Sequence, residues 1–300
     1  MSFQIAKPQR DELLYSVMAR GARYLGIVSR SDFHRGLFAH DWPTFFDLPI
    51  GLKRIAQSGS YGAADADEFV SELTLFPYFA HYASIYRGRA AKQIMYGDVG
   101  WPHRPLANWS EFAPHSSSLR FCASCLEEMI EEGGDAWWRR AHQLPSALTC
   151  PDHGEVLRLS NVATSNTRRR YIVASRELCA EESAHVVELS SPVVLSHLQW
   201  LSRESEIALN DLTEIHPDDR REGYLEALND LGLLNRQGEA KLPAIAEAMD
   251  AHWGDMLDIW PRLRNAGRCD QGWLGALLMR EDTSPPLHHL LLEGMLAAAP

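Results

Sequence analysis

The most informative segment of this 300-residue chain is Cys122-Ala-Ser-Cys125, which is separated by twenty-four residues from Cys150-Pro-Asp-His153-Gly154. Two residues between paired ligands allow a tight turn to point both side chains at one ion. Two such turns supply four ligands in a tetrahedron, and three thiolates with one imidazole leave no position for a substrate water. The sequence therefore predicts one structural Zn²⁺ on Cys122, Cys125, Cys150 and His153, which stabilises a segment too short to build its own core.

The alternative interpretation is two chance cysteine pairs with His153 as a surface residue. Ligand spacing in a chain with only 5 cysteines argues against it. Cys179 and Cys269 have no neighbours at ligand spacing, so we expect them to be small buried hydrophobic residues.

The segment between the two ligand pairs is rich in aromatic and basic side chains. It reads Trp137-Trp138-Arg139-Arg140-Ala-His142-Gln143-Leu144-Pro145. A helix beginning at Asp135 would place His142 next to Arg139 or Trp138. His142 could be a ligand or a base, or it could orient a helix end or pack against a carbonyl group.

Four tryptophans gather around the ligand pairs: Trp101, Trp109, Trp137 and Trp138. Side chains of this size either seal a small core or anchor an interface. A module this short can bury only some of them, so we expect one or two to contact a partner.

The N-terminal residues are predicted to form a pair of helices. Apolar residues of the segment from Asp11 to Leu25 share one face of a helix, which Gly26 can end. Ser29 or Ser31 can cap a second helix running through Phe38. Two helices joined by a turn of about five residues are compatible with a helix-turn-helix, and two packed helices without a DNA role are the alternative. The basic residues that could contact DNA there are Arg20, Arg23, Arg30 and Arg35.

Further short helices are expected on both sides of the ligand cluster. Residues 44–60 and 65–76 are predicted to be helical, with Pro77 closing the second, and residues 97–114 are expected to be irregular. In the C-terminal part we expect helices at Val193–Leu201, from Pro217 to just before Gly232, from Pro243 and from Pro286. The predicted fold is mostly α, built of short helices. It comprises a helix-turn-helix-like N-terminal domain (1–115), a small zinc-ribbon module (116–160) and a helical C-terminal domain (161–300).

The charge distribution limits how the chain could bind nucleic acid. The net charge is −11, and residues 181–240 hold 13 acidic against 4 basic side chains. Because a polyphosphate binder shows the opposite sign, DNA contact is expected only through the first 180 residues or with a partner's help. The basic triplet Arg168, Arg169 and Arg170 could contact phosphate or pair with an acidic segment of the chain itself.

Membrane and enzymatic functions find no support in the sequence. No stretch of about 18 apolar residues is present, and the N-terminus lacks the apolar core of a signal peptide, so we expect a cytoplasmic protein with no membrane partner. There is no Walker A loop, no His-Glu-x-x-His helix and no Gly-x-Ser-x-Gly elbow. The sequence predicts that the protein is not an enzyme.

Several motifs occur in the order typical of one protein family. They are Asp11-Glu12-Leu13-Leu14-Tyr15-Ser16-x-x-x-Arg20, Leu73-Thr74-Leu75-Phe76-Pro77-Tyr78, Leu119-Arg120-Phe-Cys122-x-x-Cys125-Leu126, Trp138-Arg139-Arg140-x-His142-Gln143-Leu144-Pro145 and Cys150-Pro151-x-His153-Gly154-x-x-Leu157. Over about the first 160 residues this combination resembles the TniQ/TnsD family. One departure is Ala123, where proline commonly follows the first cysteine, which changes the stiffness of the turn and not the ligation. Beyond residue 160 the resemblance is looser.

The resemblance implies a non-enzymatic target-selection adaptor of bacterial transposons. Such proteins recruit the AAA+ ATPase of the transposon, which licenses the transposase. Some members read an attachment site in DNA, and others sit on a CRISPR-associated Cascade complex that has read the target by guide pairing.

The alternative function is a stand-alone zinc-containing, sequence-specific DNA-binding regulator that uses the N-terminal helix pair. The acidic block at 181–240 favours a protein-docking adaptor. The sequence leaves open whether the immediate contact is the ATPase, Cascade or DNA, and whether the protein forms a homodimer.

Overall fold

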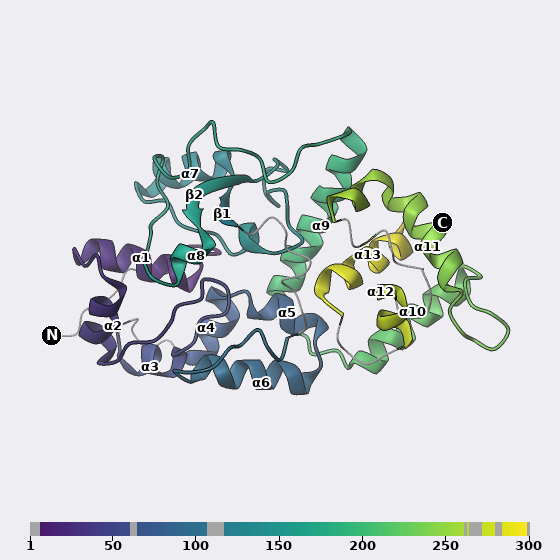
Figure 1. The fold of residues 1–300 in the computed structure, drawn as a ribbon, viewed down its shortest axis with the longest axis horizontal. Coiled ribbons are helices and arrows are strands. Elements are labelled where there is room, and N and C mark those ends of the chain that lie inside the picture. Colours follow the sequence, from purple (N-terminus) through teal and green to yellow (C-terminus); the bar gives the residue numbers. More distant parts are fainter. Residues whose placement is uncertain are drawn as a thin grey trace.

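The structure is a computed structural model that describes residues 7–60, 65–106, 117–260, 263, 272–279 and 284–298. The elongated molecule has the N-terminal helices at one end, a two-stranded sheet near the middle and the C-terminal helices at the other end (Figure 1). The described chain is mostly helical, which confirms the predicted fold class. Within these ranges no helix is long and apolar enough to cross a lipid bilayer.

Helices α1 (Leu14–Tyr24) and α2 (Arg30–Phe38) form the predicted N-terminal pair. The Ser29 side chain accepts a hydrogen bond from the Asp32 amide and caps α2. Gly26 adopts a φ of 68° in the turn, a conformation that favours glycine. Helix α1 is buried over most of its length, so it is a core element rather than a surface helix.

Four further helices complete the N-terminal part, with three differences from the prediction. They are α3 (Leu52–Gln57), α4 (Ala66–Leu73), α5 (Phe76–Tyr82) and α6 (Ile85–Tyr96). The expected helix over 44–60 shrinks to α3. Pro77 does not close a helix but lies in the first turn of α5, where its missing N–H has no helical partner to lose. Helix α6 was not predicted, because small residues such as Gly88 and Ala91 form much of its buried face and leave a weak apolar pattern.

The middle of the chain forms a small antiparallel sheet with short helical segments. Strand β1 (Ser118–Phe121) pairs with β2 (Arg158–Ala163). Helix α7 (Ala123–Gly133) follows β1, the 3₁₀ turn η2 (Ala141–Gln143) precedes the second ligand pair, and α8 (Thr164–Thr167) follows β2.

The helix from Asp135 that the sequence analysis considered for this segment is absent. The segment is extended at this point, and its backbone pairs with the N-terminus of the chain. The Leu13 amide donates to the Trp138 carbonyl (3.0 Å), and the Trp138 amide donates to Ser16 Oγ (3.0 Å). These tertiary hydrogen bonds replace the ones that a local helix would have made.

The C-terminal part is helical, as predicted. Its elements are α9 (Pro192–Asn210), α10 (Pro217–Asp230), α11 (Leu242–Trp253), the 3₁₀ segment η3 (Gly254–Ile259), α12 (Trp273–Met279) and α13 (Pro286–Ala297). Helix α9 continues nine residues beyond the predicted end at Leu201. Its second half buries Ser202 and Ser205, and buried polar residues interrupt the apolar pattern that sequence reading relies on.

Helix α9 connects the three parts of the chain. It packs against α5, against η2 and against α13, and one continuous apolar core includes residues from all three parts. The expected boundary after residue 160 falls inside β2, and a β-bridge between Arg158 and His185 extends the middle region further. The division into domains at residues 115 and 160 remains a prediction. The bridge favours a second boundary after His185.

Candidate metal centre

Each pair of ligands is presented by a short, well-defined backbone feature. Cys122 directly follows β1 and is the N-cap residue of α7, where its Sγ accepts from the Cys125 amide (3.5 Å). The second pair lies in a tight turn in which the Gly154 amide donates to the Cys150 carbonyl (2.8 Å). Gly154 has a φ of 68°, so glycine suits this position. The sequence motif thus predicts the turn that aims the side chains.

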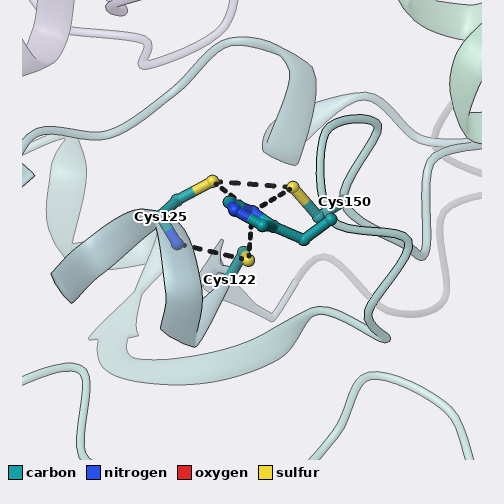
Figure 2. Close-up of side chains that lie close together, drawn as sticks. Cys122, Cys125 and Cys150 are labelled. Carbon is teal, nitrogen blue, oxygen red and sulfur yellow. Dashed lines mark hydrogen bonds between the residues drawn. The ribbon is translucent and has the colours of Figure 1, made fainter. Parts of the chain in front are cut away.

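The four predicted ligands come together. Their ligand atoms all lie within 4.8 Å of one another, and Figure 2 shows Cys122, Cys125 and Cys150 facing one another. The Nδ1 atom of His153 is 3.4 Å from Cys122 Sγ, 3.3 Å from Cys125 Sγ and 3.6 Å from Cys150 Sγ. Cys125 Sγ and Cys150 Sγ are 3.5 Å apart. These residues could hold a metal ion.

The orientation of the His153 ring fits metal ligation. Its Nδ1 faces the three sulfurs, while its Nε2 lies 2.9 Å from Glu128 Oε1 on α7. A ligating histidine usually bonds a carboxylate through its other nitrogen, which fixes the ring and its tautomer. Burial disfavours charge on His153, but Cys150 and Glu128 outweigh it and raise its pKa. The sequence analysis did not identify this contact of Glu128 with the candidate ligand His153.

The three thiols influence one another's protonation. Hydrogen bonds to Cys125 and Cys150, with burial, raise the pKa of Cys122. Hydrogen bonding with Cys122 and Cys125 lowers the pKa of Cys150, with a further contribution from His142.

Arg139 links the ligand cluster to the N-terminus. Its buried guanidinium donates to Cys125 Sγ (3.1 Å) and to Asp152 Oδ2 (2.5 Å) through Nη1, and to Asp11 Oδ2 (3.0 Å) through Nε. Burial opposes its charge, but Asp11, Cys125 and Asp152 outweigh this effect and raise its pKa. A cation donating to a ligand sulfur offsets part of the negative charge that three thiolates bring.

Two further polar residues of the same motif support the backbone. Gln143 Oε1 accepts from the Arg120 amide (3.0 Å), and its Nε2 donates to the Arg120 carbonyl (2.8 Å), so the side chain extends the sheet beside β1. Arg140 donates to the carbonyls of Thr74 and Ser71 at the end of α4 (both 2.9 Å). These side chains are committed to structural contacts.

The comparisons with known proteins agree with this architecture. Residues 4–157 match the TniQ family. The chain belongs to the TniQ family. It is also similar to the transposon Tn7 transposition protein TnsD of Escherichia coli, with 27% identity over 180 residues, covering 58% of this chain and 35% of that protein. The chain thus spans about a third of the length of this relative.

The remaining histidine and cysteine candidates of this TniQ-family protein are placed as follows. His142 is buried, with Nε2 3.8 Å from Cys125 Sγ, so it packs beside the ligand cluster and is not one of its four members. Cys179 is buried, as predicted for a small core residue. Cys269 lies outside the described residues.

The arginines expected to contact DNA divide into two groups. Arg20 is only 6% exposed and pairs with Glu12 (2.7 Å), so its guanidinium is not available to phosphate and that expectation is corrected. Arg30 is largely buried and pairs with Asp41 (2.8 Å). Arg23 is half exposed and pairs with Asp135, and Arg35 is exposed.

The basic triplet lies on the surface: Arg168, Arg169 and Arg170 are exposed. The Arg168 guanidinium stacks over the Trp101 ring, 4.9 Å from its centroid, and also lies over the Phe45 ring. Trp101 is 47% exposed. The triplet therefore combines positive charge with an accessible aromatic ring.

The tryptophans also have different roles. Trp138 is 1% exposed and donates to the Ile172 carbonyl (2.8 Å), so it seals the core and cannot anchor a partner, which corrects that expectation. Trp137 is partly exposed, and its Nε1 donates to the Arg10 carbonyl (3.1 Å). Trp109 lies outside the described residues.

Proposed function

We propose that this protein is a non-enzymatic target-selection adaptor in bacterial DNA transposition, stabilised by one structural zinc ion. The observation that carries the proposal is the match of residues 4–157 to the TniQ family. The similarity to a Tn7 transposition protein supports the same process. Because a transposition protein acts on bacterial DNA, which lies in the cytoplasm, the proposed function supports a cytoplasmic location.

The donor set and its spacing support zinc as the metal. Tetrahedral zinc with bond lengths near 2.3 Å to sulfur and 2.0 Å to nitrogen requires separations of about 3.8 Å between sulfurs and about 3.5 Å between sulfur and nitrogen. The observed 3.5 Å for Cys125–Cys150 and 3.3–3.6 Å around His153 are close to these values. Soft thiolates with one imidazole select zinc over magnesium or calcium.

The contacts of the polar residues around the ligand cluster support a non-enzymatic role. Four protein ligands complete a tetrahedral zinc site, so no position remains for a substrate. Arg139, Arg140 and Gln143 hold carboxylates, carbonyls and a backbone edge in place. The site is therefore suited to stabilising the fold that partners recognise.

The partners proposed are the AAA+ transposition ATPase and either attachment-site DNA or a Cascade complex. The surface candidates for these contacts are Arg23, Arg35, Arg168, Arg169, Arg170 and Trp137. Exposed arginines beside the Trp101 ring favour a nucleic-acid contact at the triplet. The acidic block at 181–240 favours a protein contact elsewhere.

A transposition assay with the cognate transposon genes tests the proposal. Deleting this chain should abolish insertion at the preferred target, and the wild-type gene should restore it. Cys150→Ser should fail to restore target selection, whereas Cys179→Ala, at a buried cysteine outside the ligand set, should restore it. Unchanged insertion and target choice in the deletion strain would contradict the proposal.

Salt-dependent DNA binding distinguishes the alternative, a stand-alone regulator. Each phosphate contact adds about 0.9 to the slope of log affinity against log salt. Replacing Arg168, Arg169 and Arg170 by Glu should flatten the slope if the triplet contacts DNA, while Arg20→Gln should act only through stability. Tight binding of a defined duplex at physiological salt, without any effect on transposition, would favour the regulator.

A further inference from the structure

A groove of about 570 Å³ lies where the N-terminal helices meet the linker between α9 and α10. Figure 1 shows this linker leaving α9 beside α5 and α6. The floor is apolar and includes Phe76 and Ala80 of α5 and Gly88 of α6, and Leu212 of the linker forms part of its edge. Leu212 is 66% exposed, so an apolar side chain stands unprotected at the entrance.

The rim of this groove is acidic. Six carboxylates line it, against two basic residues, Arg89 and Lys92. The carboxylates are Asp65, Asp67, Glu68, Glu72, Asp211 and Glu214. Lys92 pairs with Asp67. Burial, together with Arg220, lowers the pKa of His81, so this histidine adds no positive charge at neutral pH.

Most carboxylates of this rim form no ion pair within the described residues, although the buried Arg140 attracts Glu72 electrostatically. In the part of the chain that the structure describes, no ion pair joins Asp65, Glu68, Glu72 or Glu214 to a basic residue. Like charges held together repel one another, and a cation that reaches them from outside relieves this repulsion. The rim therefore favours positively charged ligands and disfavours a phosphate backbone.

The size and chemistry of the groove fit a peptide segment. A volume of 570 Å³ is within the range of sites that bury several side chains. Residues of α4, α5, α6 and the linker line the groove, and apolar side chains among them can accept the apolar face of an amphipathic helix. An apolar anchor would contact Phe76 and Ala80, and flanking basic side chains would reach the carboxylates.

We propose that this groove binds a segment of a protein partner in which an apolar anchor residue is flanked by lysine or arginine. The assignment of that partner to the transposition machinery rests on the proposed function, whereas the peptide chemistry rests on the groove alone. The segment docks at the junction between the TniQ-family region and the C-terminal helices.

The test uses the full chain and a fluorescent synthetic peptide in which leucines are flanked by arginines. Fluorescence anisotropy should show saturable binding that weakens as salt is added, because exposed charge pairs are screened. A matched peptide with glutamate in place of arginine should not bind. Equal binding of a peptide with serine in place of arginine would reveal a purely apolar site and would overturn the proposal.

Two kinds of variant locate the binding site. Glu72→Lys combined with Glu214→Lys should weaken binding of the arginine peptide at least tenfold. Gly88→Leu should do the same by filling the floor, since a Cβ at Gly88 meets only ordinary contacts with Ala80 (3.9 Å) and Phe76 (4.0 Å). The control is Glu226→Lys with Asp230→Lys, which makes the same charge change on exposed residues of α10 outside the groove.

The outcomes separate this inference from the proposed function. Equal loss of binding in the α10 control would indicate diffuse electrostatic attraction and would overturn the groove assignment. The peptide-binding measurement requires no transposition. It therefore tests the groove even if the transposition assay rejects the adaptor function. Loss of peptide binding only in the groove variants supports the inference, and loss of transposition in the same variants assigns the partner to that process.

Discussion

The region around the metal ligands and the C-terminal helical region are stabilised in different ways. The first has a two-stranded sheet, one helix of moderate length and short 3₁₀ and helical turns, joined by buried polar contacts such as those of Arg139 and Arg120. The second consists of helices whose apolar side chains share a core that includes Leu228, Ile245 and Trp253. One region depends on directed bonds to a few atoms, the other on many small contacts.

This difference has consequences for how each region responds to damage. Removing one ligand from a four-ligand site removes most of its binding free energy at once. Removing one apolar side chain leaves a cavity whose cost depends on its volume and on how far the neighbours relax.

The largest effect is expected for Cys150→Ser. Structural zinc binding in small modules is worth about 10–16 kcal/mol, comparable to the whole stability of a typical domain. The variant should therefore lose its metal and the fold between β1 and β2. Mass spectrometry measures the metal content, and limited proteolysis reports whether the segment between β1 and β2 is folded. Cys179→Ala is the control and should keep the metal; full metal content in Cys150→Ser would reject the site.

The second effect concerns Trp253, which is 1% exposed and donates to the Leu291 carbonyl (3.0 Å). Trp253→Ala should lower the free energy of unfolding by about 3–5 kcal/mol, because it leaves a large cavity between α11 and α13. Bound metal should remain stoichiometric. Chemical denaturation and metal analysis check the two statements, with the half-exposed Trp101→Ala as a control of small effect. Metal loss in Trp253→Ala would show that the two regions are not independent.

The third effect tests the orientation of the metal ligand. Glu128→Gln removes the carboxylate charge beside His153 Nε2 while it keeps the shape of the side chain. Loss of such a partner weakens metal affinity by about 10- to 100-fold. Competition with a chromogenic chelator measures this shift. Glu127→Gln, whose carboxylate on the same helix pairs with Arg176, is the matched control; an equal shift in both variants would exclude a specific role for Glu128.

The smallest effect is a pH dependence in the C-terminal region. Burial lowers the pKa of His288 to about 3 from its ordinary value of 6.5. The folded state keeps this imidazole neutral, whereas the unfolded chain takes up a proton below pH 6.5. Its contribution to stability is therefore complete above pH 6.5 and is lost as the pH falls towards 3, by about 1.4 kcal/mol at pH 5.5.

Comparing His288→Phe with the wild-type chain isolates this contribution. The ring of His288 stacks on Trp273, so phenylalanine preserves the aromatic contact. The variant should lose less stability between pH 7.5 and pH 5.5, as measured by urea denaturation. An identical slope in His288→Phe would rule out the assignment.

Sequence patterns were sufficient wherever the information is local. The spacing of Cys122, Cys125, Cys150 and His153 predicts a cluster that the structure assembles. Ser29, Pro217 and Pro286 mark helix starts, because caps and first-turn prolines act over a few residues.

Sequence patterns failed where distant residues decide. Arg20 and Trp138 were candidates for contacts, yet both are buried, since Glu12 neutralises the first and the core encloses the second. The segment from Asp135 resembles a helix start, but hydrogen bonds to Leu13 and Ser16 hold it extended. A local sequence pattern does not indicate which polar or aromatic residues a distant segment of the chain will bury.

The sequence alone was sufficient for the mostly α fold, the four residues that cluster as candidate metal ligands and the resemblance to the TniQ family. Only the tertiary structure decided that Arg139 joins Asp11 to a ligand cysteine, that Glu128 orients His153, and that an acidic groove lies beside α5. The physical reason is the sequence separation over which each interaction acts. Helix caps, proline turns and ligand spacing act between residues a few positions apart, whereas burial, charge neutralisation and groove shape depend on residues that only the fold brings together.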